Sequence, residues 1–209
     1  LVAGENRELK NEDIVLDTKF TTDILNKNII TVGGQYWNSE LKDGLIEAKL
    51  KQDLFGLFIE DEISILDSLR LTLGGRYDHH DKFGGHFSPR GYLVWDTTDN
   101  WTIKGGVSTG YKAPRVDQLY SGINGVTRQG KDLTYGNPNL NPETTVAYEL
   151  GFKTQFSQDD VLTLTAYYKD IFDYVRTRSA VISSARYASQ SFVTYANLDY
   201  ARSRGLEVE

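Results

Sequence analysis

The hydrophobic pattern of this chain has a period of two residues, and this period restricts the fold more than any other feature of the sequence. In LRLTLGGRY, leucines stand at positions 69, 71 and 73, with Arg70 and Thr72 between them. VLTLTAYY, WTIKGGVSTGY and YELGFKTQF alternate in the same way. Strict alternation is the pattern of a β-strand with one apolar and one polar face. Since no segment favours a helix, the sequence predicts an all-β protein of about ten strands.

The lengths of the connections alternate along the chain. Strands are predicted at 13–25, 28–37, 50–63, 68–78, 88–96, 100–110, 145–156, 160–172, 192–199 and 203–209. Short turns near 26–28, 66–67, 97–99 and 158–159 alternate with long loops at 38–49, 79–87, 111–144 and 173–191. In an up-and-down antiparallel sheet, every second connection lies at the same end. Short turns at one end and long loops at the other are typical of a transmembrane β-barrel with periplasmic turns and extracellular loops.

Strand length and aromatic residues support a membrane barrel. Many of the predicted strands exceed the roughly 9–11 residues that a tilted strand needs to cross a bilayer. Aromatic residues near their ends are candidates for interfacial girdles: Phe55, Tyr77, Trp95, Trp101, Phe156 and Phe172. A soluble β-sandwich also alternates, but it predicts neither such long strands nor this order of connections.

Composition excludes several functions. The chain has no cysteine, which removes disulfides, thiolate metal sites and cysteine nucleophiles. Its net charge of −6 argues against a nucleic-acid partner. No apolar run approaches the roughly 20 residues of a membrane helix.

Three stretches resemble a known family of outer-membrane proteins. They are FGLFIEDEISILDSLRLTLGGRYDHHDKFGGHFSPRGYLVWDTTDNWTIKGGVSTGYKAP at 55–114, GNPNLNPETTVAYELGFK at 136–153 and YANLDYARSRGLEVE at 195–209. With YKAP, NPNLNPE and YELG in this order, the chain resembles the barrel of TonB-dependent siderophore receptors of the ferric enterobactin and colicin I receptor branch. The resemblance implies a section of a barrel of about 22 strands whose lumen is plugged. It also implies the outer membrane of a Gram-negative bacterium.

The resemblance carries further expectations about domains and partners. Residues 1–209 would form a partial receptor barrel domain, with the plug domain and the terminal strands absent. The function implied is uptake of ferric siderophores, energised by the TonB complex through the missing plug region. Outer-membrane lipid or lipopolysaccharide, bacteriocins and phages are further partners that it implies. No catalytic residue, no cofactor and no nucleic-acid partner is expected.

The segment GGRYDHHDKFGGHFSPR at 74–90 holds all three histidines, His79, His80 and His86, beside Asp78 and Asp81. Imidazole and carboxylate groups are ligands for zinc and iron, so this segment has the side chains of a possible metal site. Adjacent histidines on a strand would point to opposite faces, which disfavours a shared metal. A siderophore brings its own chelating oxygens. We therefore predict no metal site, and a solvated outer loop at 79–87.

The long loops are the expected ligand-binding regions. A ferric catecholate is anionic and aromatic, so guanidinium groups and aromatic rings suit it. Loops 111–144 and 173–191 each have more basic than acidic side chains, whereas acidic residues gather at the short turns. Loop 111–144 holds three of the four prolines, which predicts an irregular cover rather than strands. The candidate ligand-binding residues are Arg115, Tyr120, Arg128, Tyr135, Arg176, Arg178 and Arg186.

The sequence leaves two other functions open. An outer-membrane protease of the omptin kind is a barrel of about ten strands. Such a protease places Asp and His residues at its outer rim, where they can activate water, and the run from Asp78 to Asp81 superficially fits. No second catalytic group could be identified on another loop. A structural or porin-like barrel is the third alternative.

Overall fold

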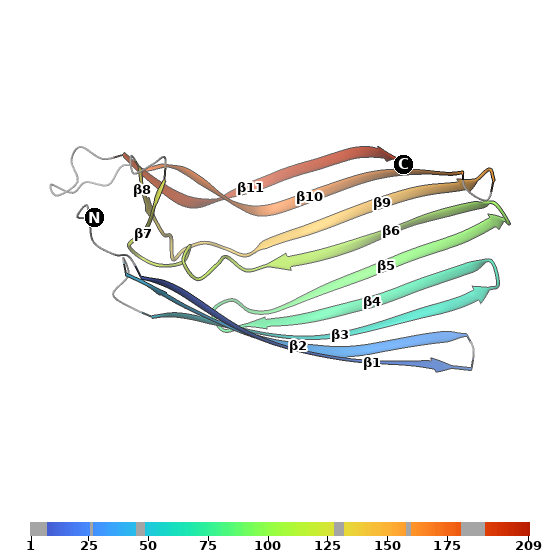
Figure 1. The fold of residues 1–209 in the computed structure, drawn as a ribbon, viewed down its shortest axis with the longest axis horizontal. Coiled ribbons are helices and arrows are strands. Elements are labelled where there is room, and N and C mark those ends of the chain that lie inside the picture. Colours follow the sequence, from blue (N-terminus) through green and yellow to red (C-terminus); the bar gives the residue numbers. More distant parts are fainter. Residues whose placement is uncertain (1–7, 26, 45–48, 128–131, 158–159, 181–190) are drawn as a thin grey trace.

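The computed structural model describes residues 8–25, 27–44, 49–127, 132–157, 160–180 and 191–209. These residues form a single sheet of eleven strands (Figure 1), and the all-β prediction is confirmed. Within the described ranges, no helix is long and apolar enough to cross a membrane. In chain order the strands are β1 (Leu9–Ile24), β2 (Asn28–Asp43), β3 (Leu50–Leu66), β4 (Leu69–His80), β5 (Gly84–Thr98), β6 (Trp101–Lys112), β7 (Ile123–Thr127), β8 (Asp132–Tyr135), β9 (Glu143–Gln155), β10 (Val161–Ala180) and β11 (Ser191–Val208).

Nine long strands form the body of the sheet. The order across it is β1-β2-β3-β4-β5-β6-β9-β10-β11-β8-β7. Every pair is antiparallel except β8 and β11, which run parallel over four residues. The two short strands β7 and β8 form a hairpin that attaches to the start of β11.

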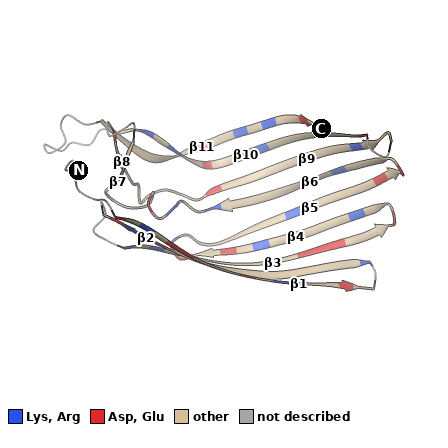
Figure 2. Cartoon of the chain, viewed as in Figure 1, with Lys and Arg blue, Asp and Glu red and all other residues tan. Residues whose placement is uncertain are grey.

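The connections fall at two opposite ends of the sheet, as Figure 1 shows. Tight turns join β3 to β4 and β5 to β6 at one end, which we call the short-turn end. The segment between β6 and β9 lies at the other end, the long-loop end. Figure 2 shows acidic residues on β3 and β5 near the short-turn end. The predicted up-and-down order is confirmed for the nine long strands.

Several strands are longer than the sequence predicts, because hydrogen-bonded pairing continues further than the alternation indicates; β2, for example, extends to Asp43 into the predicted loop 38–49. The loop predicted at 79–87 is wrong, since His80 still pairs with Gly84 and only three residues connect β4 to β5. Gly84, at φ 71°, supplies the left-handed conformation that this turn needs. The predicted strands 192–199 and 203–209 are one strand, β11, paired with β10 along its length.

Two expectations about the long loops also need correction. Loop 111–144 is not wholly irregular, because it contains β7 and β8. Leu133 of β8 and its ladder partner Phe192 of β11 are both buried where the hairpin joins the sheet. Strand β10 extends to Ala180, so Arg176 and Arg178 lie on a strand rather than in a loop.

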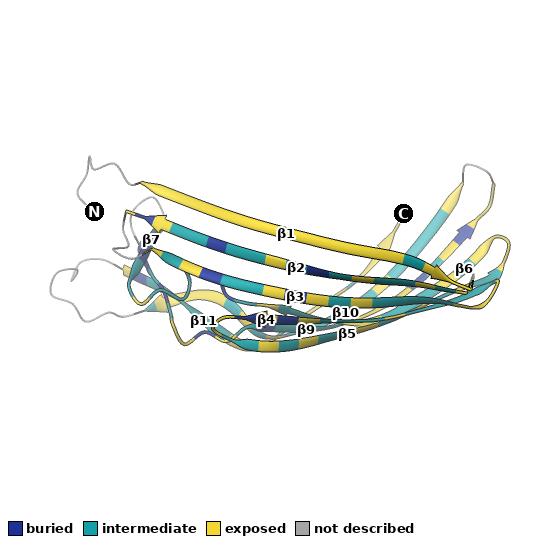
Figure 3. Ribbon diagram, turned by 90° about the horizontal axis from the view of Figure 1, so that it is seen from below, coloured by how far each residue is buried: buried dark blue, intermediate teal, exposed yellow. Residues whose placement is uncertain are grey.

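The sheet has two faces of opposite character. It curls into an open trough (Figure 3). We call the face that carries Leu57, Leu73 and Leu93 the outer face, and its opposite the inner face. The exposed large hydrophobic residues of the central strands lie on the outer face, and only Leu133, Leu140 and Phe192 are buried among the described hydrophobic residues.

A single sheet without an apolar core contradicts the soluble β-sandwich alternative, which would bury one face of each of two sheets. An apolar outer face with a polar inner face is the arrangement of a transmembrane barrel. The six predicted girdle residues, Phe55, Tyr77, Trp95, Trp101, Phe156 and Phe172, are all exposed.

Candidate functional site

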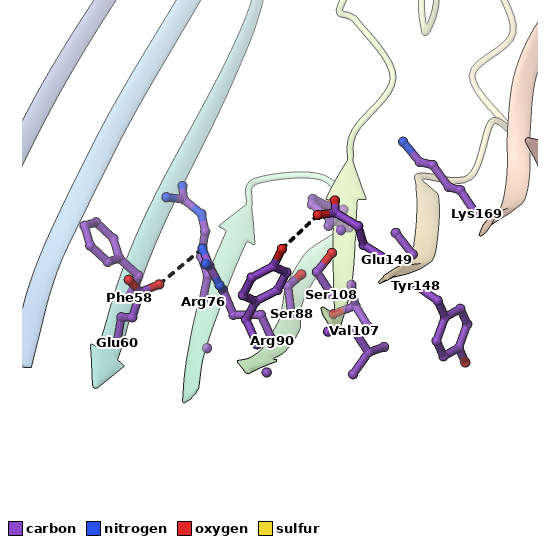
Figure 4. Close-up of a pocket in the computed structure, with 18 of the residues that line it drawn as sticks. Phe58, Glu60, Arg76, Ser88, Arg90, Val107, Ser108, Tyr148, Glu149 and Lys169 are labelled. Carbon is purple, nitrogen blue, oxygen red and sulfur yellow. Dashed lines mark hydrogen bonds and ion pairs between the residues drawn. The ribbon is translucent and has the colours of Figure 1, made fainter. Parts of the chain in front are cut away.

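A hollow of about 880 Å³ that contains several charged side chains lies on the inner face, lined by β3 to β6, β9 and β10. Glu60, Arg76, Arg90 and Glu149 extend into it in Figure 4, whereas Val107 points the opposite way. The alternation of side chains along each strand explains this separation, because charged residues occupy every second position.

One hydrogen bond in the hollow spans three strands. The Tyr92 hydroxyl on β5 donates to Glu149 Oε1 on β9 at 2.8 Å, although β6 lies between these strands. The residue of β6 that pairs with both of them is Gly106. A Cβ atom at position 106 would overlap the Tyr92 ring. Glycine therefore leaves the space that the tyrosine ring crosses. We call this arrangement a glycine bridge.

A second glycine bridge joins β3 to β5. Arg90 Nη1 lies 3.2 Å from Glu60 Oε2, and Gly74 of β4 pairs with both residues. A Cβ at Gly74 would lie 3.3 Å from Arg90 Cγ, which is tighter than ordinary contact.

A third glycine bridge joins β4 to β2. Arg76 donates from Nη2 to Gln35 Oε1 at 3.0 Å and from Nε to Asp78 at 2.7 Å. Its guanidinium occupies the position of a Cβ at Gly56 on β3. The three bridges together connect β2 with β4, β3 with β5, and β5 with β9, in each case across the strand that lies between. Among the described residues that line the hollow, Lys169 is the charged side chain without a hydrogen bond or ion pair.

The long-loop end contains a second group of polar contacts. Arg115 donates from Nε and Nη2 to the two carboxylate oxygens of Asp117, each at 2.9 Å. This carboxylate raises the pKa of the Arg115 guanidinium above its usual value. Lys112 pairs with Glu143 at 2.9 Å, and Lys82 donates to the Pro138 carbonyl at 2.7 Å. These contacts tie the segment after β6 to the ends of the neighbouring strands.

The structure separates the candidate ligand-binding residues. Arg115 lines a hollow of about 410 Å³ next to Trp37, whereas Tyr120 lines a different hollow of about 450 Å³ beside His80. Tyr135 lies on β8, where it pairs with Thr194 of β11. Arg128 and Arg186 lie outside the described residues.

Arg176 and Arg178 lie away from both hollows. Exposure alternates along this part of β10, with positions 172, 174 and 176 exposed and 171, 173 and 175 less so. Phe172 and Tyr174 belong to the outer face, and the two arginines share that face because they stand an even number of residues further along the same strand.

The histidines do not converge. His79 is exposed and His80 is only 1% exposed, as expected for neighbours on a strand. His80 Nδ1 accepts a hydrogen bond from the Lys82 backbone N–H at 3.1 Å, and burial lowers the pKa of the imidazole. His86 stacks on Tyr111 of β6, with ring centroids 4.8 Å apart. The described residues contain no group of three or more acidic or histidine side chains placed to hold a metal.

The glycine bridges were missed by the sequence reasoning. Alternation places Arg76, Arg90 and Tyr92 on the polar face, but their partners depend on the register between strands. In the sequence, a pair such as Gly105–Gly106 within an alternating strand indicates where a glycine bridge can form, because glycine in a strand often marks close approach of another group.

Comparisons with known proteins agree with this architecture. A family model described as TonB dependent receptor-like, beta-barrel, matches residues 8–209. The iron-regulated outer membrane virulence protein of Vibrio cholerae is 42% identical over 118 residues, which cover 56% of this chain and 18% of that protein. The probable TonB-dependent siderophore receptor PirA of Acinetobacter baumannii is 30% identical, covering 82% of this chain and 24% of its own length.

Solved structures show the same fold. The siderophore receptor PirA from Pseudomonas aeruginosa superimposes with a TM-score of 0.81 at 25% identity, covering 97% of this chain and 39% of that one. A mutant of the ferric enterobactin receptor from the same organism, in complex with enterobactin, gives a TM-score of 0.79 at 24% identity, covering 96% of this chain and 33% of that one.

The sheet has an apolar outer face, a polar inner face, a short-turn end and a long-loop end. These features together define a section of an outer-membrane β-barrel. The chain belongs to the TonB-dependent receptor β-barrel family. The omptin alternative is wrong, because the family that matches is a TonB-dependent receptor barrel. The chain spans only 18% to 24% of the length of the first curated relatives it matches.

Proposed function

We propose that the protein containing this segment is an outer-membrane receptor that imports ferric siderophores with energy from the TonB complex. The family match over residues 8–209 carries this proposal. It is supported by relatives named as siderophore receptors. The TonB complex would act through a plug domain outside this segment, and bacteriocins or phages would use the exposed loops.

A catecholate is the siderophore class that we favour. A ferric enterobactin receptor of Pseudomonas aeruginosa is 34% identical over 151 residues, and the ferrienterobactin receptor of Escherichia coli is 32% identical over 127. An anionic aromatic chelate suits guanidinium groups beside aromatic rings. At the long-loop end, Arg115 lies within reach of Tyr195, which contributes to its raised pKa.

Of the sequence candidates, we retain Arg115, Tyr120 and Tyr135 as proposed ligand contacts, together with Arg128 and Arg186. Arg115 is the sharpest test because Asp117 already fixes its guanidinium. A donor held in place before the ligand arrives loses less conformational entropy on binding.

The proposal can be tested in the full-length receptor. Fluorescence-quenching titrations would compare a ferric catecholate with a neutral ferric hydroxamate, and labelled-iron uptake would be followed in cells. Arg115→Ala should weaken catecholate binding about tenfold, the effect of one charge-assisted hydrogen bond. Arg70→Ala is the matched control, since Arg70 pairs with Asp96 at 3.1 Å near the short-turn end.

The outcomes test the catecholate assignment and the transport function separately. Equal affinity for both chelates would overturn the catecholate assignment. Failure of the unaltered receptor to import any ferric chelate would overturn the transport function itself.

A further inference from the structure

The connection from β8 to β9 has the sequence GNPNLNPE, residues 136–143, and we call it the clamp segment. It lies at the long-loop end of the sheet (Figure 1). Leu140 near its centre is only 2% exposed. Three of its residues are asparagines, whose side-chain amides both donate and accept hydrogen bonds. The contacts of this segment join parts of the molecule that are far apart in the sheet.

On one side, the clamp segment holds residues 115–122, which we call the Arg115 turn. The backbone N–H of Asn137 donates to the Gln118 carbonyl at 2.6 Å. A Cβ atom at position 136 would overlap the Tyr120 carbonyl oxygen. Glycine at position 136 therefore lets the two backbones approach closely enough for this hydrogen bond.

On the other side, the clamp segment is fastened to β10 and β11. Asn137 Nδ2 donates to the Tyr195 carbonyl at 3.0 Å. Asn197 Oδ1 accepts from the Asn141 backbone N–H at 2.9 Å, and Asn197 Nδ2 donates to the Asn141 carbonyl at 3.0 Å. The same Nδ2 donates at 2.6 Å to the carbonyl of Asp173, where the backbone of β10 has a left-handed φ of 54°. Side-chain amides thus attach the clamp segment to the strands.

Two charged residues extend this attachment across the sheet. Lys82, between β4 and β5, donates from Nζ to the Pro138 carbonyl at 2.7 Å. Glu143 Oε1 accepts from the backbone N–H of Val175 on β10 at 2.7 Å. Because β5, β6 and β9 lie between β4 and β10, the clamp segment joins strands that have no direct contact with each other.

Gln118 is the residue at which the clamp segment meets Arg115. The Gln118 backbone N–H donates to the Arg115 carbonyl at 3.0 Å, and Gln118 Oε1 accepts from the Arg115 backbone N–H at 2.9 Å. The Tyr120 backbone N–H donates to the Asp117 carbonyl at 3.4 Å within the same turn. Asn137, bonded to Gln118, therefore links the backbone of this turn to Tyr195 of β11.

We propose that the clamp segment positions Arg115 and Tyr120 for siderophore binding, with Asn137 and Asn197 as the positioning residues. This inference rests on the proposed function, because it takes Arg115 and Tyr120 as ligand contacts. A turn released from β11 samples more conformations, and the ligand then has to order it on binding, which lowers affinity. Asn137 and Asn197 act through the turn and need no contact with the ligand.

The Asn137 side chain makes two hydrogen bonds that substitution can separate. Its Oδ1 accepts from the Asn139 backbone N–H at 3.0 Å in a local turn, whereas its Nδ2 reaches Tyr195 of β11. A serine hydroxyl can accept in such a turn, but it is too short to replace the amide donor. Asn137→Ser therefore breaks the link to β11, retains the local turn and leaves the net charge unchanged. Asn197→Ala is a second variant that breaks the link at a different residue.

The test uses the full-length receptor and fluorescence-quenching titration with a ferric tris-catecholate. Asn137→Ser and Asn197→Ala should each weaken binding roughly three- to tenfold, the effect of ordering one or two side chains. In an Arg115→Ala/Tyr120→Ala background, Asn137→Ser should change affinity less than about twofold, because the groups that it positions are gone. A purely structural role would weaken binding equally in both backgrounds.

Asn28→Ser is the matched control. Asn28 Nδ2 also bonds another strand, donating to the two carboxylate oxygens of Asp61 at 3.1 and 2.9 Å, but at the short-turn end. The substitution removes the same kind of hydrogen bond and should leave catecholate affinity within about twofold.

Hydrogen exchange of the ligand-free receptor tests the clamp segment without a siderophore. Asn137→Ser and Asn197→Ala should speed amide exchange in residues 115–122 at least about threefold, whereas Asn28→Ser should not. Unchanged exchange in both clamp variants would overturn the clamp alone. A loss of affinity that persists in full without Arg115 and Tyr120 would also overturn it. Unchanged affinity in Arg115→Ala/Tyr120→Ala would instead overturn the proposed ligand contacts, and with them the role of the clamp segment in binding.

Discussion

Tyr92 and Glu149 are hydrogen-bonded at 2.8 Å although a complete strand lies between their own strands. Gly106 makes this possible, because its missing Cβ leaves the space that the tyrosine ring crosses. The same relation joins Glu60 to Arg90 over Gly74. In a sheet without a buried apolar core, these bridges couple strands that share no backbone hydrogen bond.

Replacing the bridging glycine should destabilise the barrel. Gly106→Val would force Tyr92 off Glu149 and bring a branched side chain against the Gly91 carbonyl. Overpacking of this kind costs about 1–3 kcal/mol. The free energy of unfolding of the full-length receptor in urea measures the effect.

Gly91→Ala is the matched control. A Cβ at Gly91 meets only Leu73 Cδ2, at an ordinary 3.5 Å, on the outer face. Its unfolding free energy should stay within about 0.5 kcal/mol of the unaltered protein. Equal losses in both variants would contradict the role of the bridge.

The Tyr92–Glu149 bond should appear as a coupling energy. Tyr92→Phe and Glu149→Gln each weaken or remove the bond, so their effects on the unfolding free energy should not add. We expect an interaction energy of about 1 kcal/mol in a double-mutant cycle. Strict additivity would show that the bond contributes nothing to stability.

The two ends of the sheet should differ in accessibility on intact cells. The chain has no cysteine, so single cysteines are unambiguous reporters. Thr127→Cys, at the end of β7, should react with a membrane-impermeant thiol reagent, whereas Thr98→Cys should react only after lysis. Both positions are exposed in the structure. The reverse labelling would invert the orientation.

Acidification should loosen the tip of the β4–β5 hairpin. Burial lowers the pKa of His80 in the folded hairpin below the ordinary value of 6.5, which the unfolded tip retains. At a pH between the folded and the unfolded pKa, the unfolded tip therefore binds more protons than the folded tip. The contribution of neutral His80 is therefore complete above about pH 6.5 and falls as the pH drops below that value. Hydrogen exchange of the hairpin, corrected for its intrinsic pH dependence, measures this loss.

Substitution of each neighbouring histidine distinguishes the cause. His80→Gln should remove the pH dependence of exchange at the tip. His79→Gln should retain it, because His79 is exposed. A pH response that survives in His80→Gln would assign the effect to another group.

The sequence by itself determined the strands and their two faces. The leucines at 69, 71 and 73 and the arginines at 70 and 76 are on opposite faces because a strand turns successive side chains to opposite sides. This rule is local, so it needs no knowledge of neighbouring strands. The same rule correctly predicted that His79 and His80 would point apart.

Only the tertiary structure decided what those side chains meet. Register between strands places Gly74 beside Glu60 and Arg90, and a shift of one residue would have placed other groups there. The parallel attachment of β8 to β11 joins residues 59 apart in sequence, from Asp132 to Ser191. The sequence predicts that Arg176 and Arg178 lie in a loop and contact a ligand, whereas the continued pairing of β10 with β11 places them on a strand, on the outer face. Such pairings depend on the summed energy of whole ladders, which no local pattern of residues contains.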